Sequence, residues 1–234
     1  MFLDFQHHCK EYEEYQEPDI PTLVNAYKSY VQEIDYRVFG GLDVTRQQQT
    51  LENIKKGNPV AVYKSGSNWG SFIGITLNNL YVGARCYLYG VFGGIGTFYI
   101  FLQNSLMLGS FQYFFYQQGV FWKSVRGIWI HGSMEIFAIV IESTAGFILG
   151  ASILFPKTYS RINSFKIGFK NSFKIFLSTI PFTIAAGFLE GFITRYSIEM
   201  ENWFSSFIIL FTLALISFYY LIYPFIVHKK TLPA

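Results

Sequence analysis

The chain of 234 residues is 51% hydrophobic and 20% aromatic, and only 14% of its residues are charged. Soluble domains carry about 25% charged residues, so this composition excludes an ordinary soluble domain and indicates a membrane protein. The formal net charge of +3 is too small to indicate a nucleic-acid-binding protein. Cys9 and Cys86 fall in different kinds of segment, so we expect neither a disulfide framework nor a cysteine metal site.

The N-terminal segment, residues 1–46, is polar and has helical periodicity that the EPDIP stretch at 17–21 interrupts. We expect a polar hairpin of two amphipathic helices here, docked on the membrane domain. The start of the chain lacks a basic region followed by an apolar one, so we expect no cleaved signal peptide. Residues 47–77 form a polar connecting segment before the chain turns hydrophobic.

Residues 78–228 are hydrophobic almost throughout and predict a transmembrane helix bundle, followed by a basic tail at 229–234. The fold class expected for the chain is therefore all-α and polytopic. Residues 106–116 are long enough only for a re-entrant helix or a short, strongly buried span. Four other stretches approach the roughly 20 residues that a bilayer demands, at 79–102, 128–154, 175–194 and 203–227.

The positions of the lysines and arginines predict the orientation of these spans. The basic loop at 157–174 and the C-terminal Lys229 and Lys230 are expected on the cytoplasmic side, with residues 195–202 outside. We expect the basic loop to meet anionic lipid headgroups. The aromatic run at 111–119 is typical of an interfacial belt.

One predicted span carries an unusual polar stripe. His131, Glu135 and Glu142 fall at i, i+4 and i+11, and Gly146 and Gly150 continue along the same side of the helix. An ionised carboxylate near the bilayer centre costs roughly 2.5–3.5 kcal/mol, whereas each Leu, Ile, Phe or Val returns only about 0.3–0.6. This stripe is therefore expected to face protein or water, with its carboxylates protonated or paired.

Small residues at helix-packing spacing recur in three spans. Glycines four residues apart let helix backbones approach closely, which predicts a compact bundle. In the third pair Glu190 lies beside the glycine face, and Pro181 precedes it where it can kink the helix. The three pairs are Gly90 with Gly94, Gly146 with Gly150, and Gly187 with Gly191.

His131, Glu135 and Glu190, with Glu142 further along the first of the two spans, form the candidate intramembrane polar site. Three interpretations remain open: a structural pairing between helices, a pathway for protons, ions or a solute, and a metal-dependent hydrolytic centre. The HGSME sequence is not the HExxH zinc motif, and no second histidine completes a zinc site. We therefore expect no catalytic residue, no resident metal and no cofactor.

Other polar residues of the spans have simpler interpretations. Arg195 and Arg85 are expected to extend to the membrane interface, although Arg85 could pair with Glu142 or Glu190 instead. The asparagines are placed at helix beginnings, where capping explains them. These asparagines are Asn78, Asn79 and Asn104.

Four motifs together resemble the stage II sporulation protein M family of multi-pass membrane proteins. In chain order they are NNLYVGARCYLYGVFGGIGT at 78–97, HGSME at 131–135, FPKTYSR at 155–161 and AGFLEGFITR at 186–195. The similarity extends over about residues 50–228. It implies a protein of the bacterial cytoplasmic (inner) membrane that is a partner of peptidoglycan-degrading proteins in an envelope complex.

On this resemblance we interpret the chain as a non-enzymatic partner or scaffold. Its expected partners are the lipid bilayer and membrane or envelope proteins, with no nucleic acid, and a homo-oligomer is compatible with the sequence. The alternative is a transporter or channel component with a polar path through His131, Glu135 and Glu190, and an intramembrane metal-dependent hydrolase ranks third.

The chain departs from the family pattern in two places. Relatives usually have an additional span between the polar N-terminal helices and a TLENIKKGNP-like segment, whereas Phe39 to Thr50 contains none, so the family's first span is expected to be missing. Glu142 stands where a small or apolar residue is expected. It is therefore not assigned to the family's functional positions.

Overall fold

The computed structural model describes residues 44–57, residue 61 and residues 66–231. The chain divides into two units, Met1–Gly41 and Leu42–Ala234, and every described residue belongs to the second. The polar hairpin expected within 1–46 lies almost wholly outside the described residues. The missing first span concerns Phe39 to Thr50, of which 39–43 are not described, so it stays a prediction.

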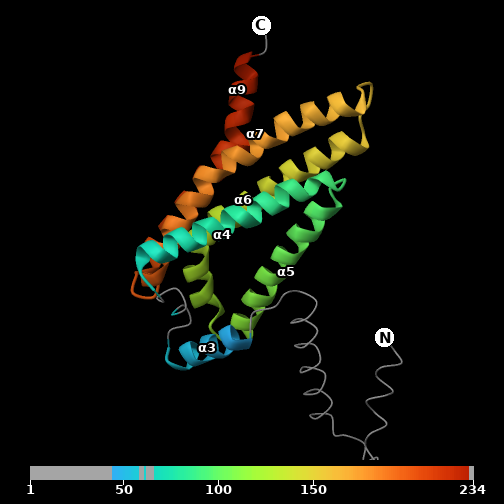
Figure 1. Ribbon diagram of the computed structural model, residues 1–234. Helices are drawn as coiled ribbons and strands as arrows, with labels where there is room; N and C mark the ends of the chain where they lie inside the picture. The colour runs from blue at the N-terminus through green and yellow to red at the C-terminus, as the bar shows by residue number, and fades with distance from the viewer. Residues whose placement is uncertain (1–43, 58–60, 62–65, 232–234) are drawn as a thin grey trace, which may run out of the picture. The chain divides into compact units, whose positions relative to one another are not determined.

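The described residues form helices and contain no strand, which confirms the all-α fold class. Four short elements of different pitch interrupt or extend the α-helices: the 3₁₀ turns η3 (Tyr89–Val91) and η5 (Thr194–Tyr196), and the π-helical turns η4 (Leu189–Ile193) and η6 (Phe218–Ile222). The α-helices, drawn in Figure 1, are α3 (Val44–Lys55), α4 (Asn68–Leu88), α5 (Ile95–Gln117), α6 (Phe121–Leu154), α7 (Arg161–Phe188), α8 (Asn202–Ser217) and α9 (Tyr223–Thr231).

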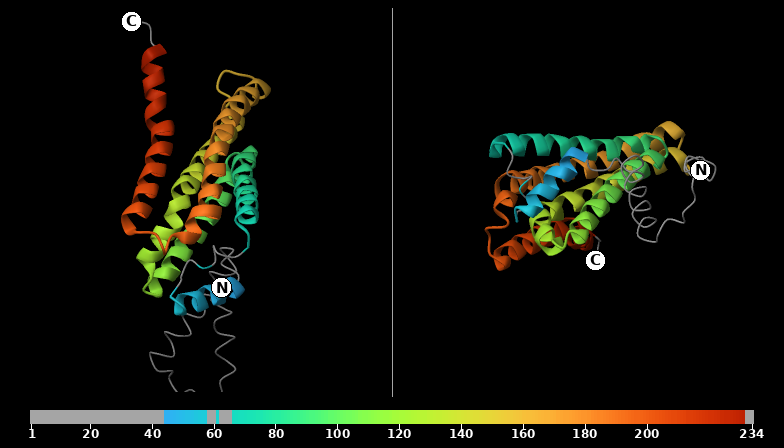
Figure 2. Two further views of the ribbon diagram at one scale, coloured as in Figure 1. Left: turned by 90° about the vertical axis from the view of Figure 1, so that its left-hand side faces the viewer. Right: turned by 90° about the horizontal axis from the view of Figure 1, so that it is seen from below.

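Within the described residues, three continuous helical stretches are long and apolar enough to cross a membrane, Phe121–Leu154, Arg161–Tyr196 and Asn202–His228. They contain the spans expected at 128–154, 175–194 and 203–227, so the chain is an integral membrane protein. The last of them joins α8, η6 and α9, which follow one another as one continuous helical run in the left view of Figure 2.

The prediction of one span at 79–102 is wrong, because these residues do not form a single helix. Its first part is the end of α4 and its second part the start of α5, with η3 and a glycine turn between them. Gly93 and Gly94 have φ angles of 66° and 84°, a left-handed conformation that glycine adopts without a steric penalty. Residues 106–116, for which the sequence predicts either a re-entrant helix or a short span, lie inside α5.

The prediction of a loop for the basic segment at 157–174 is also wrong, because most of this segment is helical. Only residues 155–160 connect α6 to α7, and from Arg161 onward the segment is helical. The helix starts at Ser160, whose hydroxyl accepts a hydrogen bond from the Asn163 amide at 3.4 Å. The stretch Arg161–Tyr196 is about 54 Å long at 1.5 Å per residue, which exceeds the roughly 30 Å hydrocarbon core. The exposed Lys166 and Lys170 therefore have room to lie beyond the hydrocarbon.

Helix α6 is at the centre of the bundle and packs against α4, α5, α7 and α8 (Figure 2). A small apolar core forms where α4 meets α6 and α7, around Tyr87, which is 1% exposed. The Tyr87 ring stacks on Phe176 with 5.0 Å between ring centroids, and its hydroxyl lies 3.2 Å from the Ser172 hydroxyl. The tyrosine thus contributes apolar area to the core while its polar end has a partner.

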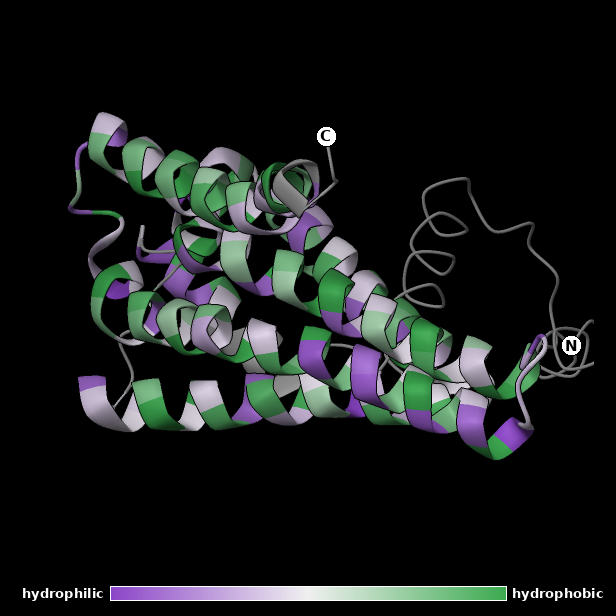
Figure 3. Ribbon diagram, turned by 90° about the horizontal axis from the view of Figure 1, so that it is seen from above, coloured by the Kyte–Doolittle hydropathy of each residue, from purple (hydrophilic) through white to green (hydrophobic). Residues whose placement is uncertain are grey.

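Many large apolar side chains point away from the bundle, especially on α8 and α9. Leu210 is 66% exposed to the surroundings of the protein, and Phe225 74%. Coloured by hydropathy, the long helices show much green, and purple appears at the turn between α6 and α7 and at separate positions along the helices (Figure 3). Such continuous apolar faces match contact with lipid chains rather than water.

The glycine pairs lie where helix backbones come close. A Cβ atom placed on Gly90 would overlap the Gly146 backbone, and one on Gly150 would overlap the backbone of Gly90, Gly93 and Gly94. These contacts support, as a proposal, the packing role expected for Gly90/Gly94 and Gly146/Gly150.

The third pair, Gly187 and Gly191, faces α4. A Cβ on Gly187 would overlap the Thr76 hydroxyl, and a Cβ on Gly191 would lie 2.9 Å from the Phe72 amide nitrogen. The same packing role is therefore proposed for this pair, in the contact between α4 and the end of α7.

We predict that Gly146→Ala lowers the stability of the protein by about 1–3 kcal/mol, because the added methyl group would have to displace backbone. Gly74→Ala in α4 is the matched control, since a Cβ at Gly74 would meet nothing within 4 Å. That control should leave stability unchanged or raise it by up to about 1 kcal/mol through helix propensity. Thermal unfolding in detergent or nanodiscs measures both, and equal effects of the two substitutions would contradict the proposed packing role.

Candidate functional site

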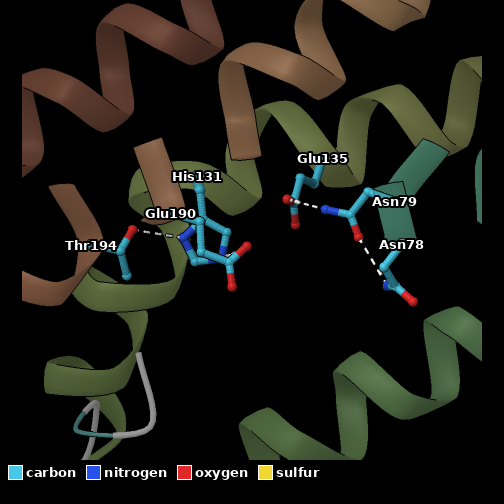
Figure 4. A network of polar contacts seen from close by, with 6 residues as sticks. All are labelled: Asn78, Asn79, His131, Glu135, Glu190 and Thr194. Atoms are coloured by element: carbon cyan, nitrogen blue, oxygen red, sulfur yellow. Dashed lines mark hydrogen bonds and ion pairs between the residues drawn. The ribbon is translucent and has the colours of Figure 1, made fainter. Parts of the chain in front are cut away.

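A cluster of polar side chains lies in the interior of the bundle, where α4, α6 and the end of α7 meet (Figure 4). Helix α6 presents His131 and Glu135, which lie one turn apart on one face because they are four residues apart. Glu190 comes from the π-helical turn η4 and Thr194 from the 3₁₀ turn η5 that follows it. Single π-helical turns inside helices are frequent at functional sites.

His131 is the centre of the cluster and contacts the end of α7 through both ring nitrogens. Its Nδ1 lies 2.9 Å from the Thr194 hydroxyl, and its Nε2 lies 3.7 Å from Oε2 of Glu190. The side chains of His131 and Glu190 are only 5% and 13% exposed. The α6–α7 contact therefore includes an imidazole and a carboxylate away from solvent.

Glu135 connects this group to α4. Its Oε1 accepts a hydrogen bond from the amide nitrogen of Asn79, and Oδ1 of Asn79 accepts one from Asn78 at 3.4 Å. One potential ligand atom each from His131, Glu135 and Glu190 lies within 4.8 Å of the other two. The structure thus brings together three of the four residues that were predicted to form the intramembrane site.

The chemistry open to this group follows from its composition. Two carboxylates within 4.8 Å of one another in a protein interior repel each other unless a proton or a cation lies between them. An imidazole beside them can accept a proton or bind a metal ion. The hydrolytic interpretation required His131 and Glu190 to lie within reach of a bridging water, and their separation of 3.7 Å meets that requirement.

With this geometry in hand, comparison with known proteins identifies the family. A family model described as Stage II sporulation protein M matches residues 31–195, which is more than half of the chain. The chain belongs to the stage II sporulation protein M family. All three clustered residues of this family member lie within the matched range. The comparison with curated proteins and the comparison with solved structures found no match.

The fourth predicted residue, Glu142, has a different environment in this stage II sporulation protein M relative. It is buried, and its Oε1 accepts a hydrogen bond from the Thr179 hydroxyl at 2.8 Å. Its carboxyl group lies where a side chain at Gly83 would be, so the absence of a Cβ at Gly83 makes room for it. Glu142 therefore occupies a second contact of α6 with α4 and α7.

Sequence reasoning missed Asn79 and Thr194 as members of the cluster. The capping role expected for the asparagines is wrong, because Asn78, Asn79 and Asn104 all lie inside helices. Asn104 instead donates a hydrogen bond to the Ile100 carbonyl at 2.7 Å. The signal for Asn79 was its spacing: it precedes Gly83 by four residues, which places it on the α4 face that packs inward.

Arg195, expected to extend to the membrane interface, packs against the protein instead of pointing away from the bundle. The residue is 8% exposed, and its guanidinium donates hydrogen bonds to the Asn68 side-chain oxygen and, at 3.5 Å, to the Ser71 hydroxyl. Arg195 therefore ties the end of α7 to the start of α4.

Arg85 remains half-buried on α4. Its guanidinium carbon lies 5.6 Å and 5.7 Å from the ring centroids of Tyr81 and Tyr89, so it makes cation–π contacts within its own helical segment. Among the described residues, no ion pair joins Arg85 to Glu142 or Glu190.

The Glu142 contact generates a double-mutant prediction. Gly83→Ala should destabilise the protein because its methyl group would overlap the Glu142 carboxyl. In a Glu142→Ala background the same substitution should cost less, with a coupling of about 0.5–3 kcal/mol between the two sites. Thr179 retains the Phe176 carbonyl as a partner in that background. Unfolding of the four variants in nanodiscs gives the coupling, and a value near zero would contradict the contact.

Proposed function

We propose that this protein is a non-enzymatic membrane scaffold that holds a partner in a cell-envelope complex. The observation that carries the proposal is that polar groups of three separate helical segments pair with one another inside the bundle. Asn79 of α4 bonds Glu135 of α6, and His131 of α6 contacts Glu190 and Thr194 at the end of α7. Membership of the stage II sporulation protein M family supports the envelope location.

The pairing has a clear structural value in a membrane protein. Lipid chains are as apolar as the helix surfaces, so the hydrophobic effect does not drive helices together inside a bilayer. Polar contacts and close packing must therefore determine which helices associate. Each satisfied polar contact specifies one partner helix and one register between the two helices. A bundle fixed in this way offers a partner a constant surface.

The proposal includes a location and an orientation. The family resemblance supports the cytoplasmic membrane of a bacterium and a partner that degrades peptidoglycan, and a homo-oligomer is compatible with it. The exposed lysines at the start of α7, together with Lys229 and Lys230 in the sequence, support a cytoplasmic position for the start of α7 and for the C-terminus, near anionic lipids. Labelling of a cysteine introduced at Lys170 from each side of the membrane tests this orientation, and labelling from the outside alone would contradict it.

If the cluster is structural, His131→Ala and Glu190→Gln should weaken folding or partner capture. His131→Ala would leave Thr194 and Glu190 without this contact, and a buried polar group without a partner costs about 1–3 kcal/mol. Thermal unfolding of the solubilised protein and recovery of the native envelope complex measure the two effects. Unchanged stability together with unchanged complex recovery for both variants would count against the scaffold.

A transporter or channel component is the second candidate, and one observation favours it. Glu142 follows Glu135 by two helical turns, about 10 Å along α6, so a half-buried carboxylate and a buried one occur at two depths of one helix. Carboxylates in that arrangement are typical of ion and proton pathways. On this hypothesis Glu135→Gln and Glu190→Gln should each reduce ion or solute flux into proteoliposomes, and flux indifferent to both substitutions would exclude it.

A further inference from the structure

We propose that His131, Glu135 and Glu190 bind one divalent transition-metal ion of the zinc class, which cross-links α6 to the end of α7. This inference goes beyond the scaffold function and does not depend on it. The sequence leaves a metal site open as one interpretation but predicts no resident metal, because no second histidine completes a zinc site. The structure adds the geometry: Glu190, 55 positions beyond Glu135 in the chain, has a ligand atom within 4.8 Å of those of His131 and Glu135.

The distances match ligands on one ion better than they match a direct ion pair. Zinc binds imidazole nitrogen and carboxylate oxygen at about 2.0–2.2 Å, so two ligands in tetrahedral arrangement lie about 3.3–3.6 Å apart. Nε2 of His131 and Oε2 of Glu190 are 3.7 Å apart, whereas a charge-assisted hydrogen bond would bring them to about 2.7–2.9 Å. A Glu135 oxygen lies within 4.8 Å of both ligand atoms, so a shift of this side chain toward them would complete a set of three ligands.

The orientation of His131 also fits a ligand. In the tautomer that carries its proton on Nδ1, the ring donates to the Thr194 hydroxyl and directs the lone pair of Nε2 toward Glu190. A lone pair directed at a carboxylate oxygen is repulsive unless a positive charge lies between them. Metal-binding histidines almost always donate their other ring N–H to a neighbouring acceptor in this way.

The electrostatics of the cluster require positive charge. Two carboxylates and a neutral imidazole have a formal charge of −2, and the side chains of His131 and Glu190 are almost completely covered. No lysine or arginine among the described residues forms an ion pair with Glu135 or Glu190. A divalent ion would neutralise both carboxylates at once and replace their repulsion by attraction.

Asn79 is an outer partner of the proposed site. Its amide nitrogen donates to Oε1 of Glu135, which leaves the other carboxylate oxygen for the ion. Asn78 in turn donates to Asn79, so the orientation of the amide is defined by its own neighbour. Hydrogen bonds of this kind hold the first ligands in position at metal sites.

The donor set determines the class of ion. One imidazole nitrogen with two carboxylate oxygens suits Zn²⁺, Fe²⁺ or Mn²⁺, whereas Ca²⁺ demands six to eight oxygen ligands and Mg²⁺ an octahedral set rich in water. Three protein ligands leave a fourth position on a tetrahedral ion for water or another group.

The test measures the number of zinc ions bound per chain of protein in nanodiscs. The protein carries no polyhistidine tag, because such a tag would itself bind the ion. Metals are first removed with a chelator, and the protein is then dialysed against ZnCl₂. Elemental mass spectrometry should find about one zinc ion per chain in the wild-type protein. Glu135→Gln and Glu190→Gln should each weaken zinc affinity at least tenfold, since even loss of an outer partner costs about 10–100-fold. Asn79→Ala should weaken it within that range.

Glu142→Gln is the matched control, as the same substitution on the same helix at a buried carboxylate outside the cluster. It should retain the zinc of the wild type. Zinc should also raise the unfolding temperature of the wild type and of Glu142→Gln, a comparison that remains valid if a cluster variant fails to fold. The inference is overturned if wild-type protein retains no zinc, if all three Glu→Gln variants retain it equally, or if excess Mg²⁺ displaces it.

Discussion

The structure depends on one constraint: polar groups inside a bilayer must find their partners within the protein, because the hydrocarbon supplies none. This chain places an imidazole and two carboxylates on membrane-crossing helical segments, and their partners come from other segments of the bundle. The packing of α6 against α4 and the end of α7 follows from these contacts as much as from the apolar surfaces. Helix α6 occupies the centre because it carries polar groups toward both neighbours.

Close approach of the backbones is the condition for these contacts. Short polar side chains such as those of Asn79 and Thr194 reach α6 because α4 and the end of α7 lie close to it. Glycine permits the approach of α4 to α6 at Gly146 and the approach of α7 to α4 at Gly187. Gly83 shows the same relation in a different form, since the space without a side chain there is occupied by the Glu142 carboxyl. The glycines at the helix contacts and the polar side chains of the interior therefore depend on each other in the packing of the bundle.

Much of the fold follows from the sequence, since hydrophobic length predicts spans well, and the spans expected at 128–154, 175–194 and 203–227 all lie in long apolar helices. The span at 79–102 failed because the turn at Gly93 and Gly94 depends on left-handed backbone conformations that hydropathy does not report. A pairing of His131 with residues of the other span is one of the interpretations that the sequence left open, whereas the capping role expected for Asn79 is wrong and the contacts of Arg195 with α4 were not expected. Whether such a side chain faces solvent or a neighbouring helix depends on how the helices are arranged, and that arrangement is not encoded in the local sequence.

The two carboxylate environments along α6 differ in a way that bears on their roles. Glu142 is a single carboxyl group with a hydroxyl donor from Thr179 and no second acid among its described hydrogen-bond partners, so one proton suffices to make it neutral. Glu135 faces Glu190 and an imidazole whose Nδ1 already has a partner, so one proton leaves a charge behind. Excess negative charge at buried, mutually close ligands is the property that binds cations. Cation binding is therefore expected at the end of α6 that holds His131, and packing alone is expected at Glu142.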